Sequence, residues 1–208
     1  RHRIVRLDLP GFGLTGPVAD RDYSAARYAR VVVALLDHLG IPRADIAGNS
    51  LGGRVAMVVA LDHPSRVRRL VLVDAAGLGG QRLPPIFRLA RTPVLNGLLR
   101  WVTPRAVVRA NVNDVYGDQS RVTDAVVDRY YDLMRREGNR GATIDRFVNL
   151  ADPHLDDRLR EIHVPVLLEW GERDQWIPVA FAHRLEHGIQ GAKLVVYPDA
   201  GHVPMEEL

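Results

Sequence analysis

The stretch from residue 44 to residue 73 constrains the possible folds of this chain more than any other feature. Leu51 to Leu61 is apolar on nearly every side at helical spacing, and short strand-like segments flank it at residues 44–48 and 70–73. A helix without a polar face has to be buried on most sides. A strand, a buried helix and a second strand in this order are typical of a parallel sheet with a crossover helix. We therefore expect an α/β fold.

The rest of the chain continues this alternation. Residues 4–9 are predicted to form a short buried strand that ends at a Pro-Gly turn, and residues 164–170 and 194–197 have the same strand-like character. Helices are predicted over residues 24–39, where apolar side chains recur on one face, and over residues 179–186. Strands that alternate with helices predict a mostly parallel sheet with helices packed on both faces.

The alternation is interrupted between residues 78 and 163. No strand pattern occurs there, and short amphipathic helices are separated by prolines and glycines. We therefore expect an α/β core made of residues 1–77 and 164–208, with a helical insertion over residues 78–163. Five aromatic residues of the insertion either pack within it or line an apolar pocket: Phe87, Trp101, Tyr116, Tyr130 and Tyr131.

The composition excludes several classes of function. The chain has no cysteine, so a disulfide, a thiol nucleophile and a cysteine-ligated metal are excluded. Its 28 basic residues, all arginine except Lys193, are interspersed with 25 acidic ones, which indicates a solvated surface and no nucleic-acid partner. No apolar run is long enough to span a membrane, and no leader sequence is evident. We expect a cytoplasmic protein that needs no metal or cofactor; nothing in the sequence indicates its oligomeric state.

A nucleophile motif lies between the strand at residues 44–48 and the apolar helix. Gly48 to Gly53 (Gly-Asn-Ser-Leu-Gly-Gly) contains the G-x-S-x-G pattern, which forms a sharp strained turn that presents the Ser50 hydroxyl above a sheet edge. The backbone N–H of Leu51, at the helix N-terminus, then points to the oxygen that gains negative charge during attack. An ordinary glycine-rich turn with an incidental serine is the alternative, and the flanking strand and apolar helix make it the weaker one.

Ser50 requires two partners further along the chain, because a serine hydroxyl needs a base and the base needs an orienting acid. In a fold of this kind the three follow in the order serine, acid, histidine. Asp174 and His202 each follow a predicted strand, so both lie beyond the carboxyl ends of parallel strands, at the edge that presents Ser50. Asp74 also ends a strand and is the alternative acid.

A second glycine motif, Gly11 to Gly16, has the G-x-G-x-x-G spacing of a dinucleotide-binding turn. Such a turn has to open a helix immediately, and an acidic residue should end a second strand about 20 residues further on. Here Pro17 follows, the helix begins only near Ser24, and the acid at that spacing, Asp37, lies within the helix. We therefore predict a tight loop and no nucleotide site.

Together these motifs resemble those of the α/β-hydrolase family, over nearly the whole chain. Residues 8–13 resemble the loop after the family's fourth strand, and residues 48–53 resemble the nucleophile elbow after the fifth. Residues 171–174 and 201–202 resemble the loops that carry the acid and the histidine. Four matches in the right order indicate both the fold and serine-type chemistry.

The resemblance implies a serine hydrolase in which Ser50 attacks, His202 relays the proton and Asp174 orients the imidazole. Leu51 supplies one oxyanion-hole donor, and residues 78–163 correspond to the lid that selects what enters the pocket. The family pattern also places three strands before the first one seen here and a helix after the histidine, so we expect a core that is incomplete at both ends. The loop with the second oxyanion donor is then absent, which predicts reduced stability and turnover.

The expected function is hydrolysis of a carboxylic ester in a small apolar molecule, through acyl transfer to serine. Carbon–carbon bond hydrolysis of aromatic ring-fission products is the first alternative, because the Gly-Asn-Ser-Leu-Gly-Gly elbow resembles that branch of the family. That branch tends to carry tryptophan after the histidine, where this chain has Val203. The second alternative is a ligand-binding receptor that keeps the fold and the triad with little turnover.

Overall fold

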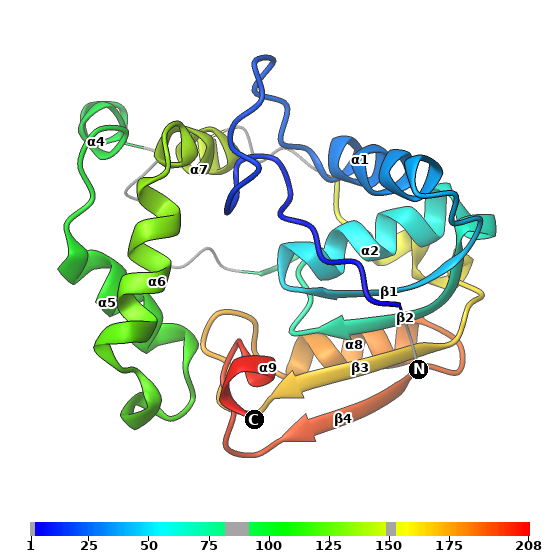
Figure 1. The fold of residues 1–208 in the computed structure, drawn as a ribbon. Helices are drawn as coiled ribbons and strands as arrows, with labels where there is room; N and C mark the ends of the chain where they lie inside the picture. Colours follow the sequence, from blue (N-terminus) through cyan, green and yellow to red (C-terminus); the bar gives the residue numbers. More distant parts are fainter. Residues whose placement is uncertain (1–2, 82–91, 149–152) are drawn as a thin grey trace.

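The computed structural model describes residues 3–81, 92–148 and 153–208, and within them four parallel strands form one sheet (Figure 1). Neighbouring strands follow one another in chain order, β1-β2-β3-β4. Their bounds are β1 Ala44–Asn49, β2 Val67–Val73, β3 Val166–Gly171 and β4 Lys193–Tyr197. The prediction of an α/β fold with a parallel sheet and flanking helices is confirmed.

One face of the sheet is covered by helices. The helix α2 (Leu51–Asp62) packs on β1 and β2, α8 (Ala180–Gly188) packs on β3 and β4, and α1 (Ala25–His38) packs on α2. All residues of α2 from Gly53 to Leu61 are buried, as its apolar surface predicts. The strand side chains that point to these helices are buried with them in one apolar cluster: Leu70, Leu72, Val166, Leu168 and Trp170.

The opposite face of the sheet is more open to solvent. Val71 and Leu167 are paired across β2 and β3 and are half-buried, and Val195 on β4 is 41% exposed. The sequence predicts helices on both faces, whereas α2 and α8 share one. Because β2 and β3 carry apolar side chains on both faces, they have the composition of strands that are buried on both sides.

Residues 4–9 do not form the predicted strand. They pair with no strand in the described structure, where the sheet ends at β1. Ile4 is 78% exposed, and Val5 and Leu7 are each 39% exposed. An apolar run becomes a strand only where a neighbouring strand bonds its backbone N–H and C=O groups. The prediction was wrong for this segment because composition does not report whether that neighbour is present.

The loop after residue 9 is held by helices. The Tyr28 hydroxyl donates to the Pro10 carbonyl at 3.0 Å, and the Arg146 guanidinium donates to the Gly11 carbonyl at 3.0 Å. Arg146 also lies 3.7 Å from the centre of the Phe12 ring. The glycine motif thus forms a tight loop against α1 and α7 (Asn139–Val148), and α1 begins only at Ala25.

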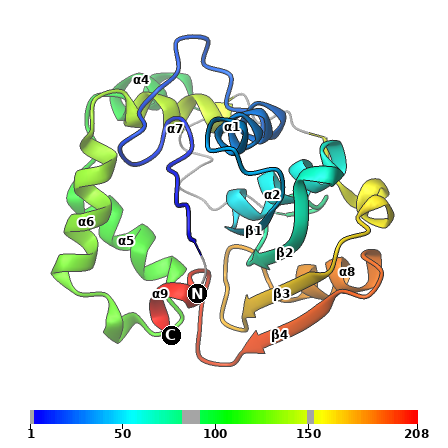
Figure 2. The same ribbon diagram turned by 45° about the vertical axis from the view of Figure 1, so that its right-hand side comes forward.

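Helices α4 to α7 form a group beside the sheet, on the side to which the strands point (Figures 1 and 2). The described part of residues 78–163 contains no strand. Val108, Val112 and Val127 lie at the centre of its own apolar cluster. No helix in the described ranges is long and apolar enough to cross a membrane. The group consists of α4 Pro93–Leu99, α5 Arg105–Val115, η2 Gln119–Arg121, α6 Asp124–Arg135 and α7 Asn139–Val148. The short helix η3 (Asp156–Glu161) lies apart from the group and packs on α8.

Replacing two adjacent leucines tests which face of the sheet carries the core. Leu168 is fully buried on the helix-covered face, whereas Leu167 points to the open face. We expect Leu168→Ala to lower the free energy of unfolding by about 2–5 kcal/mol, and Leu167→Ala to lower it by less than half as much. Urea unfolding followed by circular dichroism measures both. Equal losses would contradict the assignment of an open face.

Candidate active site

Ser50 lies at a sharp turn between β1 and α2, with φ at 52° and ψ at −116°. A residue with a side chain rarely adopts a positive φ, and such strain is found mainly at functional turns. Two glycines make the turn possible. A Cβ on Gly48 would overlap the backbone of Gly52, and a Cβ on Gly53 would lie 2.5 Å from the Ala75 Cβ. The motif therefore adopts the elbow geometry that its sequence predicts.

One backbone donor beside Ser50 is left without an acceptor. The Ser50 N–H donates to the Val73 carbonyl at 2.9 Å, and the Ser50 carbonyl accepts from the N–H groups of Arg54 and Ala76. The Leu51 N–H is the first of α2 and has no acceptor within the described residues. Because the N-terminus of a helix carries partial positive charge, this N–H is suited to bind an oxyanion.

Asp174 and His202 form a buried pair. The His202 Nδ1 lies 2.7 Å from the Asp174 Oδ2, and the two side chains are 4% and 0% exposed. The other carboxylate oxygen, Oδ1, accepts the backbone N–H groups of Trp176 at 2.7 Å and Ile177 at 2.9 Å. Three donors at one carboxylate fix the direction in which it points. This arrangement orients the imidazole so that its Nε2 is the free nitrogen.

Asn49 connects the histidine to the elbow. Its Nδ2 donates to the His202 carbonyl at 2.9 Å and to the Val73 carbonyl at 3.2 Å. The residue before Ser50 therefore holds the backbone of His202. The sequence does not predict this role, although Asn49 stands within the motif. The indole of Trp176 also lies 5.3 Å from the imidazole, centre to centre. No hydrogen bond between the Ser50 hydroxyl and the imidazole is present in the described structure, so that contact stays a prediction.

The comparisons with known proteins agree with this geometry. A family model described as "Alpha/beta hydrolase family" matches residues 1–207. The chain belongs to the α/β hydrolase family. It is 33% identical to a 2-hydroxy-6-oxononadienedioate/2-hydroxy-6-oxononatrienedioate hydrolase from Pseudomonas putida, with 97% of this chain and 71% of the relative aligned.

Two solved structures extend the comparison. A meta-cleavage product hydrolase from Pseudomonas fluorescens IP01 has a TM-score of 0.79 and 26% identity, covering 96% of this chain and 73% of the other. Est816, described as an N-acyl homoserine lactone degrading enzyme, has a TM-score of 0.74 and 29% identity, covering 96% and 78%. The α/β hydrolases that resemble this chain thus include a meta-cleavage product hydrolase and a lactone-degrading enzyme.

Asp74, the alternative acid, lies beside the pair but is not bonded to the imidazole. It is fully buried, and its Oδ1 accepts the Gly171 N–H at 3.0 Å. Its carboxyl faces that of Asp174, and burial first, then the Asp174 charge, raise the pKa of Asp74 to about 9. The raised pKa favours the neutral form of Asp74, which makes it the poorer candidate for the charged acid beside His202. The geometry favours Asp174 for that position.

Asp74, Asp174 and His202 form the only group among the described residues whose side chains lie close enough together to hold a metal ion. One ligand atom each from Asp74, Asp174 and His202 lies within 4.8 Å of the others. The Asp174 oxygens already accept two N–H groups and bond the imidazole, and a protonated Asp74 is a poor ligand. The cluster is suited to hydrogen bonding and not to a cation.

The aromatic residues of the insertion have different surroundings. Tyr116 is buried, and Tyr130 and Tyr131 pack against the apolar cluster around α5 and α6. Trp101 is 80% exposed, so it is not part of that packing. Phe87 lies outside the described residues. Packing within the insertion, the first of the two expected roles, accounts for the three tyrosines.

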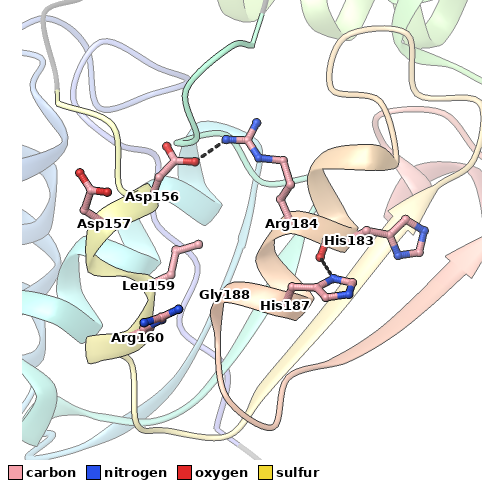
Figure 3. A pocket seen from close by; sticks show the side chains of 8 residues that line it. All are labelled: Asp156, Asp157, Leu159, Arg160, His183, Arg184, His187 and Gly188. Atoms are coloured by element: carbon pink, nitrogen blue, oxygen red, sulfur yellow. Dashed lines mark hydrogen bonds and ion pairs between the residues drawn. The ribbon is translucent and has the colours of Figure 1, made fainter.

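An open cavity of about 560 Å³ lies between η3 and α8 (Figure 3). Asp156 and Arg184 form an ion pair across it, and the His187 Nδ1 bonds the His183 carbonyl. Most of the side chains that line the cavity are charged or histidine, and none belongs to the predicted triad. Substrate pockets are mostly apolar with a few converging polar groups, which this cavity does not resemble.

Asp74→Asn tests the protonated state of the buried carboxyl. Its native pKa of about 9 exceeds the ordinary value of 3.8, so the native state binds the extra proton and the free energy of unfolding falls as pH rises between these values. Asparagine keeps both hydrogen-bonding atoms and removes this loss. We expect the variant's gain over wild type to grow by at least about 1 kcal/mol between pH 5 and pH 8, measured by urea unfolding. A gain in the free energy of unfolding that does not change with pH would contradict the assignment of a neutral Asp74 in the native state.

Proposed function

We propose that this α/β hydrolase acts by serine catalysis, with Ser50, His202 and Asp174 as its triad. The observation that carries the proposal is the buried Asp174–His202 pair, tied by Asn49 to a strained elbow that presents Ser50. These groups provide a nucleophile, a base with one free nitrogen and an acid that cannot reorient. A passive ligand-binding site would need neither a strained serine nor an oriented imidazole.

The chemistry follows from the placement of these groups. The His202 Nε2 takes the proton from the Ser50 hydroxyl as its oxygen attacks a carbonyl carbon. The Leu51 N–H stabilises the oxyanion, and Asp174 stabilises the imidazolium that forms. The imidazolium then gives its proton to the leaving group. Water repeats the sequence to release the acyl group from Ser50.

A ring-fission product is the substrate class that we favour, with cleavage of a carbon–carbon bond next to a ketone. The relatives named for 2-hydroxy-6-oxo-dienedioates and for meta-cleavage products support it, as does the Gly-Asn-Ser-Leu-Gly-Gly elbow. In such a compound the carbon leaving group is conjugated, so it tolerates the negative charge that bond cleavage creates. The carboxylic ester expected from the motifs alone has less support.

Ester or lactone hydrolysis is the second candidate. Val203 follows the histidine where the ring-fission branch tends to carry tryptophan, and Val203 packs on α5. The resemblance to a lactone-degrading enzyme also favours it. Both candidates use the same nucleophile and differ only in the leaving group.

We also propose that residues 78–163 are a lid over the site. Helices α4 to α7 of this segment lie on the side to which the strands point, where Ser50, Asp174 and His202 follow the strand ends (Figure 1). Ligands in open parallel sheets bind beyond the carboxyl ends of the strands. A helical cover at this edge would exclude water and select the substrate.

Ser50→Ala tests the nucleophile. We expect kcat to fall by about 10⁴-fold or more and covalent capture by a fluorophosphonate to disappear, because no hydroxyl remains to attack. Ser65→Ala, at an exposed serine of η1 (Pro64–Arg66), is the matched control and should keep both. Mass spectrometry of the labelled protein measures capture. Labelling of Ser50 without turnover of any substrate would indicate a receptor in place of an enzyme.

A substrate panel tests the leaving group. We expect kcat/KM for 2-hydroxy-6-oxononadienedioate to exceed that for p-nitrophenyl butyrate and for an N-acyl homoserine lactone by at least about tenfold, because a site discriminates through transition-state contacts to the leaving group. Loss of the dienolate absorbance measures the first reaction. The reverse order would assign the chain to the ester and lactone hydrolases.

A further inference from the structure

The loop that carries His202 is attached to the insertion as well as to the sheet. The His202 N–H donates to the carbonyl of Val115, the last residue of α5, at 2.7 Å. Val203, the next residue, is buried in the apolar cluster with Val108 and Val112 of α5. A residue of the insertion therefore fixes the backbone of the proposed catalytic base.

Two glycines bring the main chains of these segments into direct contact. A Cβ on Gly201 would lie 2.5 Å from the Gly117 nitrogen and 2.5 Å from the Val115 oxygen. A Cβ on Gly117 would lie 2.5 Å from the Gly201 nitrogen. Any residue with a side chain at position 117 or 201 would overlap the backbone of the other segment. Residues 115–118, which we call the lid turn, and residues 200–202, the histidine loop, thus lie against each other without intervening side chains.

The carboxylate of Glu207 joins the lid turn to the histidine loop. Its Oε1 accepts the Gly201 N–H at 2.7 Å, and its Oε2 accepts the N–H groups of Gly117 at 2.9 Å and Asp118 at 3.1 Å. Glu207 is 4% exposed and lies in the short helix α9 (Pro204–Glu207). No ion pair with its carboxylate occurs in the described structure, where Arg121 bonds its backbone carbonyl. The charge is thus balanced by backbone donors of two segments.

Glu206, its neighbour, has a different set of partners. Its carboxylate accepts the hydroxyls of Tyr116 at 2.9 Å and Tyr130 at 3.0 Å and pairs with Arg129. It therefore contacts side chains of the insertion and does not contact the histidine loop. The two adjacent glutamates differ in the one contact that matters for the position of His202.

We propose that Glu207 is a positioning residue, whose carboxylate holds the lid turn and the histidine loop in one fixed arrangement. The proposal rests on the proposed function of His202. The lid turn then cannot move away from the site without drawing His202 from Asp174, so a displaced lid turn is coupled to a misplaced base. Substrate has to enter between other parts of the insertion, while the lid turn stays in place.

Glu207→Gln breaks this arrangement with little change of shape. One carboxylate oxygen becomes an NH₂ group, a donor, which then faces the N–H of Gly201 or those of Gly117 and Asp118. We expect kcat to fall by at least about tenfold with KM changed less than about threefold, because a base displaced by a fraction of an ångström acts poorly on bound substrate. Glu206→Gln is the matched control and should keep kcat within about twofold.

The proton in the Asp174–His202 hydrogen bond gives a readout that does not depend on turnover. We expect the far-downfield proton resonance of the His202 Nδ1–H to shift or broaden in Glu207→Gln and to stay in place in Glu206→Gln. If wild type turns over none of the panel, this resonance still tests the role of Glu207 alone. Failure of the proposed function and failure of this inference therefore give different results.

Glu207→Asp covers the case in which the glutamine variant does not fold. It keeps the charge but shortens the side chain by one methylene, so the carboxylate can bond only one of the two segments, and we expect a smaller fall of kcat and the same direction of resonance change. A variant at position 207 that melts at a lower temperature but keeps wild-type kcat and an unchanged resonance when folded would overturn the proposal, because Glu207 would then be structural only.

Discussion

The hydrogen bond between Asp174 and His202 is the interaction on which the arrangement of the site depends. Both side chains are buried, and a buried charge without a partner is costly, so the loops after β3 and β4 have to meet. The parallel register brings the two strand ends to one edge, and Gly171 lets the loops touch where any side chain would overlap the histidine loop. The N–H groups of Trp176 and Ile177 then leave the carboxylate one direction in which to point.

The parts of this arrangement that the sequence predicted are those with a local signal. A strand, the Gly48 to Gly53 turn and an apolar helix occupy adjacent residues, so their geometry follows from spacing and composition alone. Asp174 and His202 were predicted because each follows a strand, and parallel strands place their carboxyl ends together. The expected ester substrate has less support than its carbon–carbon alternative, because an elbow motif specifies the nucleophile and says little about the pocket.

The parts that were not predicted depend on contacts between distant segments. Residues 4–9 have the composition of a strand, but strand formation requires a neighbour that the segment itself does not encode. The Glu207 carboxylate meets the lid turn 90 residues earlier in the chain, and no pattern near Glu207 indicates it. The raised pKa of Asp74 follows from burial beside a second carboxyl, which only the packed sheet creates.

The positive φ of Ser50 has a consequence for how such a chain changes over generations. A glycine at this position would adopt the same backbone without strain, so a single substitution to glycine would relax the turn while removing the hydroxyl. Selection for folding stability alone would therefore favour a protein of the same shape without the proposed nucleophile. At Ser50 the demand for a relaxed backbone and the proposed demand for a reactive hydroxyl thus oppose each other.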